Sequence, residues 1–357
     1  VEGVDHLELR VQQGALHQRR ECLVLVGKAL PVCQECAEAA GRWRDVGGFL
    51  ERASRTTDMH LGAAQLATGQ EDAALELLQA SLEHREAALG PAHPEVADTL
   101  NNLAVLHRNR GDLRRARAEL ERALRISEAT LGEEDPAVAT TLNDLGVVLL
   151  ELGELVQAEE RLEAAAALKR AAFGPDALEL ATVLGNLGAL HLERGDVAGA
   201  EELGRQELAI LERALGQQHS RVAEALGNLA VVSARSGQLG EAEFFRRRAL
   251  TILERSLGAA HPATARARAE LGGMLLGRGE QEPARALLES ALAAQEKGGE
   301  AHPDLGRTRR LLAAVALREA DLDRAETLLV QSRDAFAASL PAEHPETVAT
   351  QQSLALL

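Results

Sequence analysis

The chain has 357 residues and a formal net charge of −16 at pH 7. Nucleic acids and anionic membranes bind positive surfaces, so we expect neither as a general partner. Apolar runs such as residues 22–26 are far shorter than the roughly 20 residues that a membrane-spanning helix needs. The three cysteines suggest no disulfide framework, which favours a reducing, cytoplasmic location.

Residues 1–50 do not show the pattern of the rest of the chain. We predict a helical N-terminal cap there, because the end units of repeat arrays are atypical. Cys22, Cys33 and Cys36, with His17 nearby, are possible soft ligands, and metal or redox sensing by these thiols is one alternative. Their spacing matches no common zinc module, so we predict no metal site, no cofactor, and half-buried thiols instead.

From residue 89 onward the chain repeats itself with a constant step of 42 residues. A leucine or phenylalanine followed by glycine marks each step, at Leu89, Leu131, Phe173, Leu215 and Leu257. A fixed period of this size indicates an array of stacked units, none of which buries its apolar face alone.

Each period contains two helical patterns separated by a glycine. His93-Pro94 opens the first pattern, and Gly111 separates it from the second. The apolar positions follow the i, i+3, i+4, i+7 spacing of a helix, at Leu100, Leu103, Ala104 and His107 and then at Ala116, Leu120, Ala123 and Leu124. The recurring His-Pro histidines lie one unit apart, too far to share a metal, so we interpret them as helix caps: His93, His261, His302 and His344, with His219 as a variant.

The turn glycine and a small residue five positions later keep their phase along the chain. The glycines are Gly69, Gly111, Gly153, Gly195, Gly237 and Gly279, with Ala320 in this place after one deletion. The small residues are Ala74, Ala116, Ala158, Ala200, Ala242, Ala284 and Ala325. We predict that these alanines mark the close crossing of the two helices in each hairpin.

The combined pattern resembles the tetratricopeptide repeat, and the 42-residue step with Leu-Gly-x-x-His-Pro between units is similar to its kinesin-light-chain type. The resemblance implies an all-α fold, a right-handed superhelical α-solenoid of stacked antiparallel helix pairs. It implies a repeat domain over residues 51–357, with a degenerate first repeat, six full repeats from about residue 93 and a partial last repeat from about residue 344. The first helices would line a concave groove that binds peptides or protein surfaces.

In the resembling family, the groove positions carry the partner contacts. Here they would be Asn101, Asn102, Val105, Arg108, Asn143, Asp144, Val147, Leu150, Asn186, Leu192, Asn228, Val231 and Arg235. Asn102, Asn186 and Asn228 form a ladder of amides, which can donate to and accept from a peptide backbone of any sequence. The alternative is that asparagine occurs here only because the inner face of the array is solvated, with no role in binding.

The charge along these positions changes sign. The early part is acidic, with Asp98, Asp144, Glu151 and Glu193, and the late part is basic, with Arg266, Arg307, Arg310 and Arg318. We expect an acidic segment of a partner at the C-terminal half of the groove, held by Arg266, Arg307 and Arg310. The alternative is that these arginines pair with local carboxylates such as Glu270 and Asp304.

One repeat departs from the packing pattern. Where other units place leucine and alanine, the chain has Gly204 and Glu207, and Arg246 replaces the leucine one unit later. We predict a Glu207–Arg246 ion pair across the unit boundary, and the alternative is that both side chains point to solvent.

No phosphate loop, nucleophile elbow or paired Cys/His arrangement occurs, so we do not expect an enzyme. We predict a non-catalytic module that binds a peptide or partner protein, as the scaffold or sensor of a larger bacterial-type signalling or effector assembly. The composition, rich in alanine, arginine, glycine and leucine, is typical of a GC-rich genome. The alternative function is an inhibitor or regulatory domain of an associated enzyme such as a protease or kinase.

Overall fold

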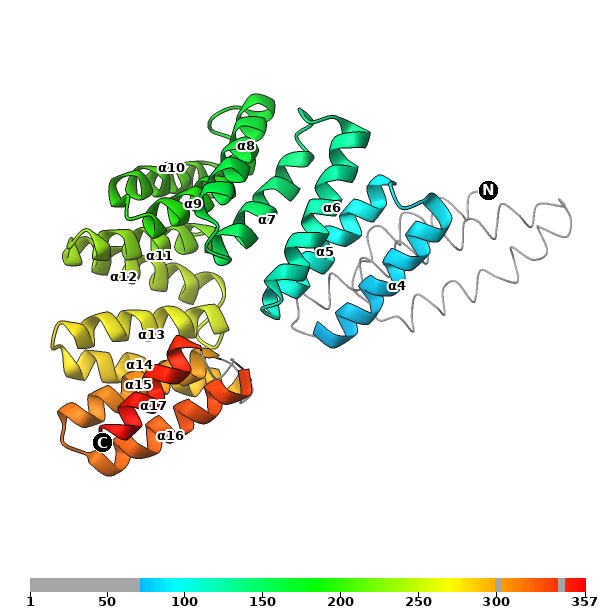
Figure 1. Cartoon of the computed structure of the whole chain (residues 1–357). Helices are drawn as coiled ribbons and strands as arrows, with labels where there is room; N and C mark the ends of the chain where they lie inside the picture. Colours follow the sequence, from blue (N-terminus) through cyan, green and yellow to red (C-terminus); the bar gives the residue numbers. More distant parts are fainter. Residues whose placement is uncertain (1–70, 299–302, 340–343) are drawn as a thin grey trace, which may run out of the picture. The chain divides into compact units, whose positions relative to one another are not determined.

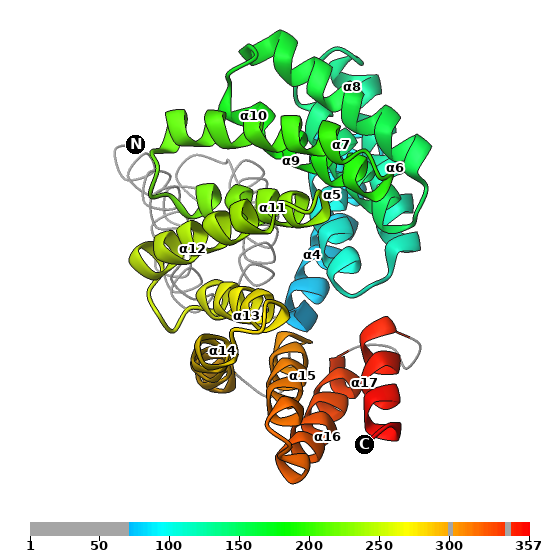
Figure 2. The same cartoon turned by 90° about the vertical axis from the view of Figure 1, so that its left-hand side faces the viewer.

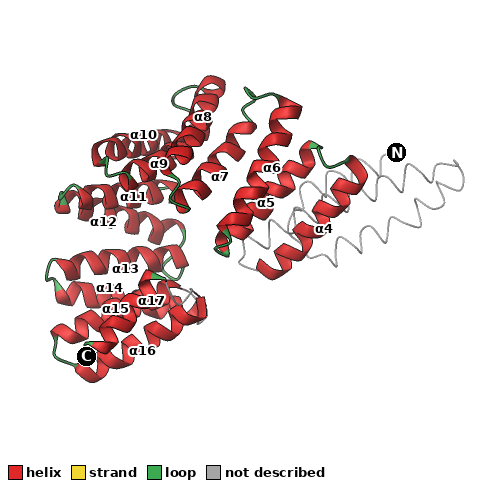
Figure 3. Cartoon of the chain, viewed as in Figure 1, coloured by secondary structure: helices red, strands yellow, loops and turns green. Residues whose placement is uncertain are grey.

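The computed structural model describes residues 71–298, 303–339 and 344–357. Within these ranges the chain forms α-helices and one short 3-10 turn, with no strand (Figure 3). The chain is therefore an all-α helical repeat solenoid, as predicted. The cap expected over residues 1–50 and the cysteines in it lie outside the described residues.

The helices follow one another in antiparallel pairs joined by short turns (Figure 1). Their bounds are α4 Glu71–Leu89, α5 Pro94–Asn109, α6 Leu113–Leu131, α7 Val138–Glu151, α8 Leu155–Phe173, α9 Leu178–Glu193, α10 Val197–Leu215, α11 Ser220–Arg235, α12 Leu239–Ser256, α13 Pro262–Gly277, α14 Gln281–Gln295, α15 Pro303–Arg318, α16 Leu322–Ser339 and α17 Pro345–Ala355. We call α5, α7, α9, α11, α13 and α15 first helices, and the helix after each a second helix.

The helices bury the faces that the apolar spacing predicts. In α5 the residues Leu100, Leu103, Ala104 and His107 are all buried, and in α6 so are Ala116, Leu120, Ala123 and Leu124. The small residues predicted at the crossings are almost completely buried at all seven positions, from Ala74 to Ala325. A methyl group there allows the two helices of a hairpin to pack closely.

Residues with a positive φ end the helices at regular intervals. They fall every 21 residues from Gly90 to Gly279, and Gly111 has a φ of +78°. Ala320 is the one non-glycine residue with a positive φ in the described chain, at 60°. It stands where the sequence predicts a turn glycine to be replaced, which confirms the shifted register of the last repeat.

The histidines before the first helices act as N-caps. The Nδ1 atoms of His93, His219, His261 and His344 each accept a hydrogen bond from the backbone N–H two residues later, at 3.2 Å. These bonds satisfy one of the free N–H groups at each helix start. The cap interpretation is confirmed for these four residues, and His302 lies outside the described residues.

The chain divides into two compact units, Val1–Arg161 and Leu162–Leu357, with the boundary inside α8. In the described part of the first unit, α4 packs on α5, α5 pairs with α6, and α7 follows α6. In the second unit, α9 pairs with α10, α11 with α12, α13 with α14 and α15 with α16, and α17 packs on α16 (Figure 2).

Candidate binding surface

In the first unit, Asn101 bridges two consecutive first helices. Its Nδ2 donates to Oγ1 of Thr141 on α7 at 3.0 Å, and the Thr141 hydroxyl returns a bond to Asn101 Oδ1 at 3.3 Å. Thr141 is buried. The Asn101 amide, predicted as a groove residue, therefore joins two repeats.

Asn143 occupies the equivalent position of the next repeat and is only 7% exposed. Its Nδ2 donates to Oδ1 of Asp144 at 3.1 Å. The amide is thus buried rather than on an open surface. A buried amide of this kind is not accessible to a partner in this structure.

The other groove residues predicted in the first unit are all half-buried on first helices: Asn102, Val105, Arg108, Asp144, Val147 and Leu150. Arg108 forms an ion pair with Glu151, with 3.7 Å between Nε and Oε1. The two charges belong to consecutive first helices, so this pair also spans a repeat boundary.

In the second unit, α11 presents the most open part of the predicted surface. Asn228, Val231 and Arg235 are exposed and lie three and four residues apart, on one face of the helix. On α9, Asn186 and Leu192 are half-buried. We call these five residues the α9–α11 face.

The predicted Glu207–Arg246 ion pair is wrong. Arg246 pairs through Nη1 with Oε2 of Glu270 on α13. Glu207 is only 8% exposed, so it does not point to solvent either. Its Oε2 is buried without a hydrogen-bond partner.

Gly185 of α9 explains where the Glu207 side chain goes. A Cβ atom built on Gly185 would lie 2.8 Å from both Glu207 carboxylate oxygens. The carboxylate therefore fills the space that a side chain at position 185 would take. Burial raises the pKa of Glu207 to about 7, against the attraction of Arg221, while Glu224 raises it further.

In the second unit, three of the predicted arginines surround two carboxylates. We call Arg266, Arg307 and Arg310 the arginine cluster, and their partners are Asp304 and Glu346. Asp304 accepts from Arg266 at 2.8 Å and from Arg307 at 3.0 Å. Glu346 of α17 accepts from Arg307 at 3.1 Å and also pairs with Arg310. The local pairing considered as an alternative is present for Asp304, whereas Glu270 pairs with Arg246 instead.

The sequence matches a known repeat family over much of its length. The tetratricopeptide repeat profile matches residues 54–129, 95–171, 137–213 and 221–297, which together make up more than half of the chain. The chain belongs to the tetratricopeptide repeat (TPR) family. TPR proteins bind protein partners and are generally non-catalytic, so the family indicates a protein-interaction scaffold.

Solved structures with similar folds include other TPR-type proteins. BtubC (BKLC) from P. vanneervenii is 22% identical over 65% of this chain and 91% of that chain, with a TM-score of 0.52. The apo form of RapI is 13% identical over 85% and 99%, with a TM-score of 0.57. A putative kinesin light chain from Podosopora anserina, with nearly identical TPR-like repeats, is 24% identical over 57% and 96%, with a TM-score of 0.49.

The expectation of a TPR protein is therefore confirmed, and its kinesin-light-chain type stays a prediction. No curated protein sequence matches the chain.

Sequence reasoning missed two contacts of this TPR surface, Glu207 at Gly185 and Arg246 with Glu270. A signal for both was present. Gly185 and Gly227 stand at the repeat position where Asn101 and Asn143 stand in earlier units. A Cβ atom on Gly227 would lie 3.9 Å from Arg246 Nη1, so the second-helix side chain passes close to this glycine too.

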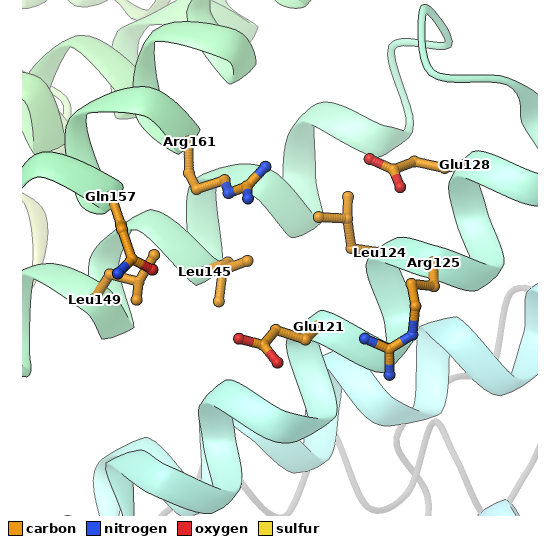
Figure 4. A pocket seen from close by; sticks show the side chains of 8 residues that line it. All are labelled: Glu121, Leu124, Arg125, Glu128, Leu145, Leu149, Gln157 and Arg161. Atoms are coloured by element: carbon orange, nitrogen blue, oxygen red, sulfur yellow. The ribbon is translucent and has the colours of Figure 1, made fainter. Parts of the chain in front are cut away.

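None of the predicted groove residues lines a small opening in the first unit. Its volume is about 260 Å³, and it lies among α6, α7 and the start of α8 (Figure 4). Leu124, Leu145 and Leu149 form its apolar part, and Glu121, Glu128, Arg125, Gln157 and Arg161 supply the polar side chains. It is smaller than the roughly 300–1,000 Å³ of typical small-molecule sites, so we assign no ligand to it.

Over the described ranges, no three His, Cys, Asp or Glu side chains are grouped as a metal site would require. In the same part of the TPR chain, no helix combines the length and the apolar character needed to cross a membrane.

Proposed function

We propose that the first helices hold an extended segment of a partner protein, and that the α9–α11 face is the centre of this contact. The observation that carries the proposal is the exposed row of Asn228, Val231 and Arg235 on α11. The row offers an amide for a peptide backbone, an apolar contact and a charge on one helix face.

The partner in this proposal carries an acidic segment that reaches the arginine cluster of α13 and α15. Three guanidinium groups there share two carboxylates, Asp304 and Glu346, so one positive charge is in excess. We place the chain in the cytoplasm, as a scaffold or sensor in a bacterial-type signalling or effector assembly. The alternative, a regulator of an associated protease or kinase, differs only in the identity of the partner.

Affinity capture from an extract of the source cells, followed by mass spectrometry, tests this function. We expect a protein that the wild type and the Asn101→Ala variant retain but that Asn186→Ala/Asn228→Ala loses. Asn101 serves as the matched control because its amide bonds Thr141 within the array. If all three proteins retain the same set, the α9–α11 face takes no part in binding.

The double variant Asn186→Ala/Asn228→Ala should bind the captured partner about 30-fold more weakly, because each lost hydrogen bond contributes about 1 kcal/mol. Isothermal titration calorimetry measures this change. The helical circular dichroism and the melting temperature should remain near those of the wild type, since Asn228 is exposed. Unfolding of the array by the double substitution would instead show that the two amides are structural.

Neutralising the arginine cluster with Arg266→Gln, Arg307→Gln and Arg310→Gln should slow association with the partner by about tenfold at low salt and flatten its salt dependence. Stopped-flow mixing at several salt concentrations measures both. The control is Arg205→Gln, an arginine of α10 that pairs with Glu201 and Glu241. An association rate equal to that of the control would contradict the expected contact with an acidic segment.

A further inference from the structure

In the first unit, a pair of polar side chains joins two consecutive first helices. The contact line between α9 and α11, which we call the α9–α11 seam, lacks this pair. In the first unit, Asn101 and Thr141 exchange hydrogen bonds between α5 and α7. Two repeats later, 84 residues on, the same positions hold Gly185 and Ala225. The first helices therefore provide no polar side chain at this point of the α9–α11 seam.

A second helix supplies one instead. Glu207 of α10 reaches the seam, with its carboxylate directly against the Cα side of Gly185. At this repeat position four other units have buried alanines, Ala123, Ala165, Ala249 and Ala291, and two have buried serines, Ser81 and Ser332. Glu207 is thus an addition to this one repeat, and Gly185 is the residue that leaves room for it.

The carboxylate is not satisfied where it lies. Glu207 is more than nine-tenths buried, and no group donates to its Oε2. Arg221 of α11, the cation that acts on this carboxyl, donates through Nη2 to Oγ1 of Thr182 at 2.8 Å. A buried carboxylate oxygen without a donor is rare in folded proteins, because it loses its hydration without replacement.

Residues near Glu207 in the two first helices add a negative charge and two amide side chains. The charge of Glu224 on α11 raises the pKa of the Glu207 carboxyl. Asn186 follows Gly185 in the chain, and Asn228 lies one turn beyond Glu224 on α11. A segment held by the two amides would therefore pass over Glu207.

We propose that the partner segment places a lysine or arginine side chain beside the Glu207 carboxylate, next to Gly185, where its N–H groups donate to the carboxylate. This assignment rests on the proposed function and adds a specificity residue to it. A basic side chain fits the site because it supplies the missing donors and because the negative charges of Glu207 and Glu224 both favour a cation there. An ionised acidic or an apolar side chain at the same point would leave Oε2 without a donor.

A selection with random twelve-residue peptides displayed on phage, using the whole chain as bait, tests the assignment. We expect the enriched peptides to share one lysine or arginine. One such peptide, and its copy with norleucine in place of the basic residue, are then titrated against the wild type and Glu207→Ala. Alanine is the residue of four other repeats at this position, so the variant should keep the fold, which circular dichroism checks.

We expect norleucine to weaken binding to the wild type at least tenfold and binding to Glu207→Ala less than twofold. Glu202→Ala, which removes an exposed carboxylate from the same helix, should behave as the wild type does. An equal loss for the wild type and Glu207→Ala, or enriched peptides without a shared basic residue, overturns the assignment alone. A selection that yields no binding peptide overturns both the assignment and the peptide-binding function.

Discussion

We expect Glu207→Ala to raise the free energy of unfolding by about 2–3 kcal/mol at pH 8. Burial raises the pKa of this carboxyl from its ordinary 4.5 to about 7, and each unit corresponds to about 1.4 kcal/mol. The lost contacts of the two methylene groups offset part of this gain. Urea unfolding followed by circular dichroism measures the change.

The gain should depend on pH in a defined direction. Because the pKa is higher in the folded chain than in the unfolded chain, the wild type loses stability as pH rises from about 4.5 through about 7. At pH 4 the carboxyl is mostly protonated in both states, so the gain should nearly vanish. Arg221 and Glu224, both of α11, are the charged groups that act on this carboxyl, and Gly185 of α9 adds none.

The exposed Glu202→Ala is the control for this measurement, and we expect it to change the stability by less than about 0.5 kcal/mol. A gain for Glu207→Ala that is the same at pH 4 and pH 8 would mean that the ionisation of Glu207 is not what destabilises the repeat. A loss of stability at both pH values would mean that the carboxylate has donors in solution.

We expect Gly306→Ala to lower the free energy of unfolding by about 2–3 kcal/mol, through a clash in the α15–α16 hairpin. A Cβ atom on Gly306 would lie 2.8 Å from Cε1 and 2.9 Å from Cδ1 and Cζ of the Phe336 ring. The ring is rigid and completely buried, so we expect it to move only by displacing its neighbours. Thermal and urea unfolding both measure the effect.

Gly240→Ala is the matched control, because nothing lies within 4 Å of its added methyl group in α12. It should stabilise the chain by up to about 1 kcal/mol, as alanine does in place of glycine within helices. In a Phe336→Leu background the cost of Gly306→Ala should shrink, since a smaller side chain makes room. Equal effects of Gly306→Ala and Gly240→Ala would show that the ring yields without cost.

At both Gly185 and Gly306, a side chain of the second helix packs against a glycine of the first helix. Both glycines lie on first helices and admit a long side chain of the following second helix, Glu207 in one case and Phe336 in the other. The apolar ring stabilises its hairpin by burial, whereas the carboxylate is left without a donor. Only the Gly185–Glu207 arrangement leaves a polar group that a partner could satisfy.

The period of the sequence by itself determined the helices and their order. Gly111 ends α5, Ala320 takes the place of a turn glycine, His93 caps a helix start, and Ala116 is buried at a crossing, each as predicted. These features are local, or repeat between neighbouring units. They follow from backbone conformation and from helix periodicity, and a single sequence displays both.

Only the tertiary structure decided which polar side chains meet. Asn101 meets Thr141, Arg246 meets Glu270, and Glu207 meets no donor. Repeat phase assigns a residue to a position, but it does not tell how far a long side chain extends past its own helix layer. That reach depends on whether the neighbouring position carries a side chain or a glycine, and so on the packing of three helices at once.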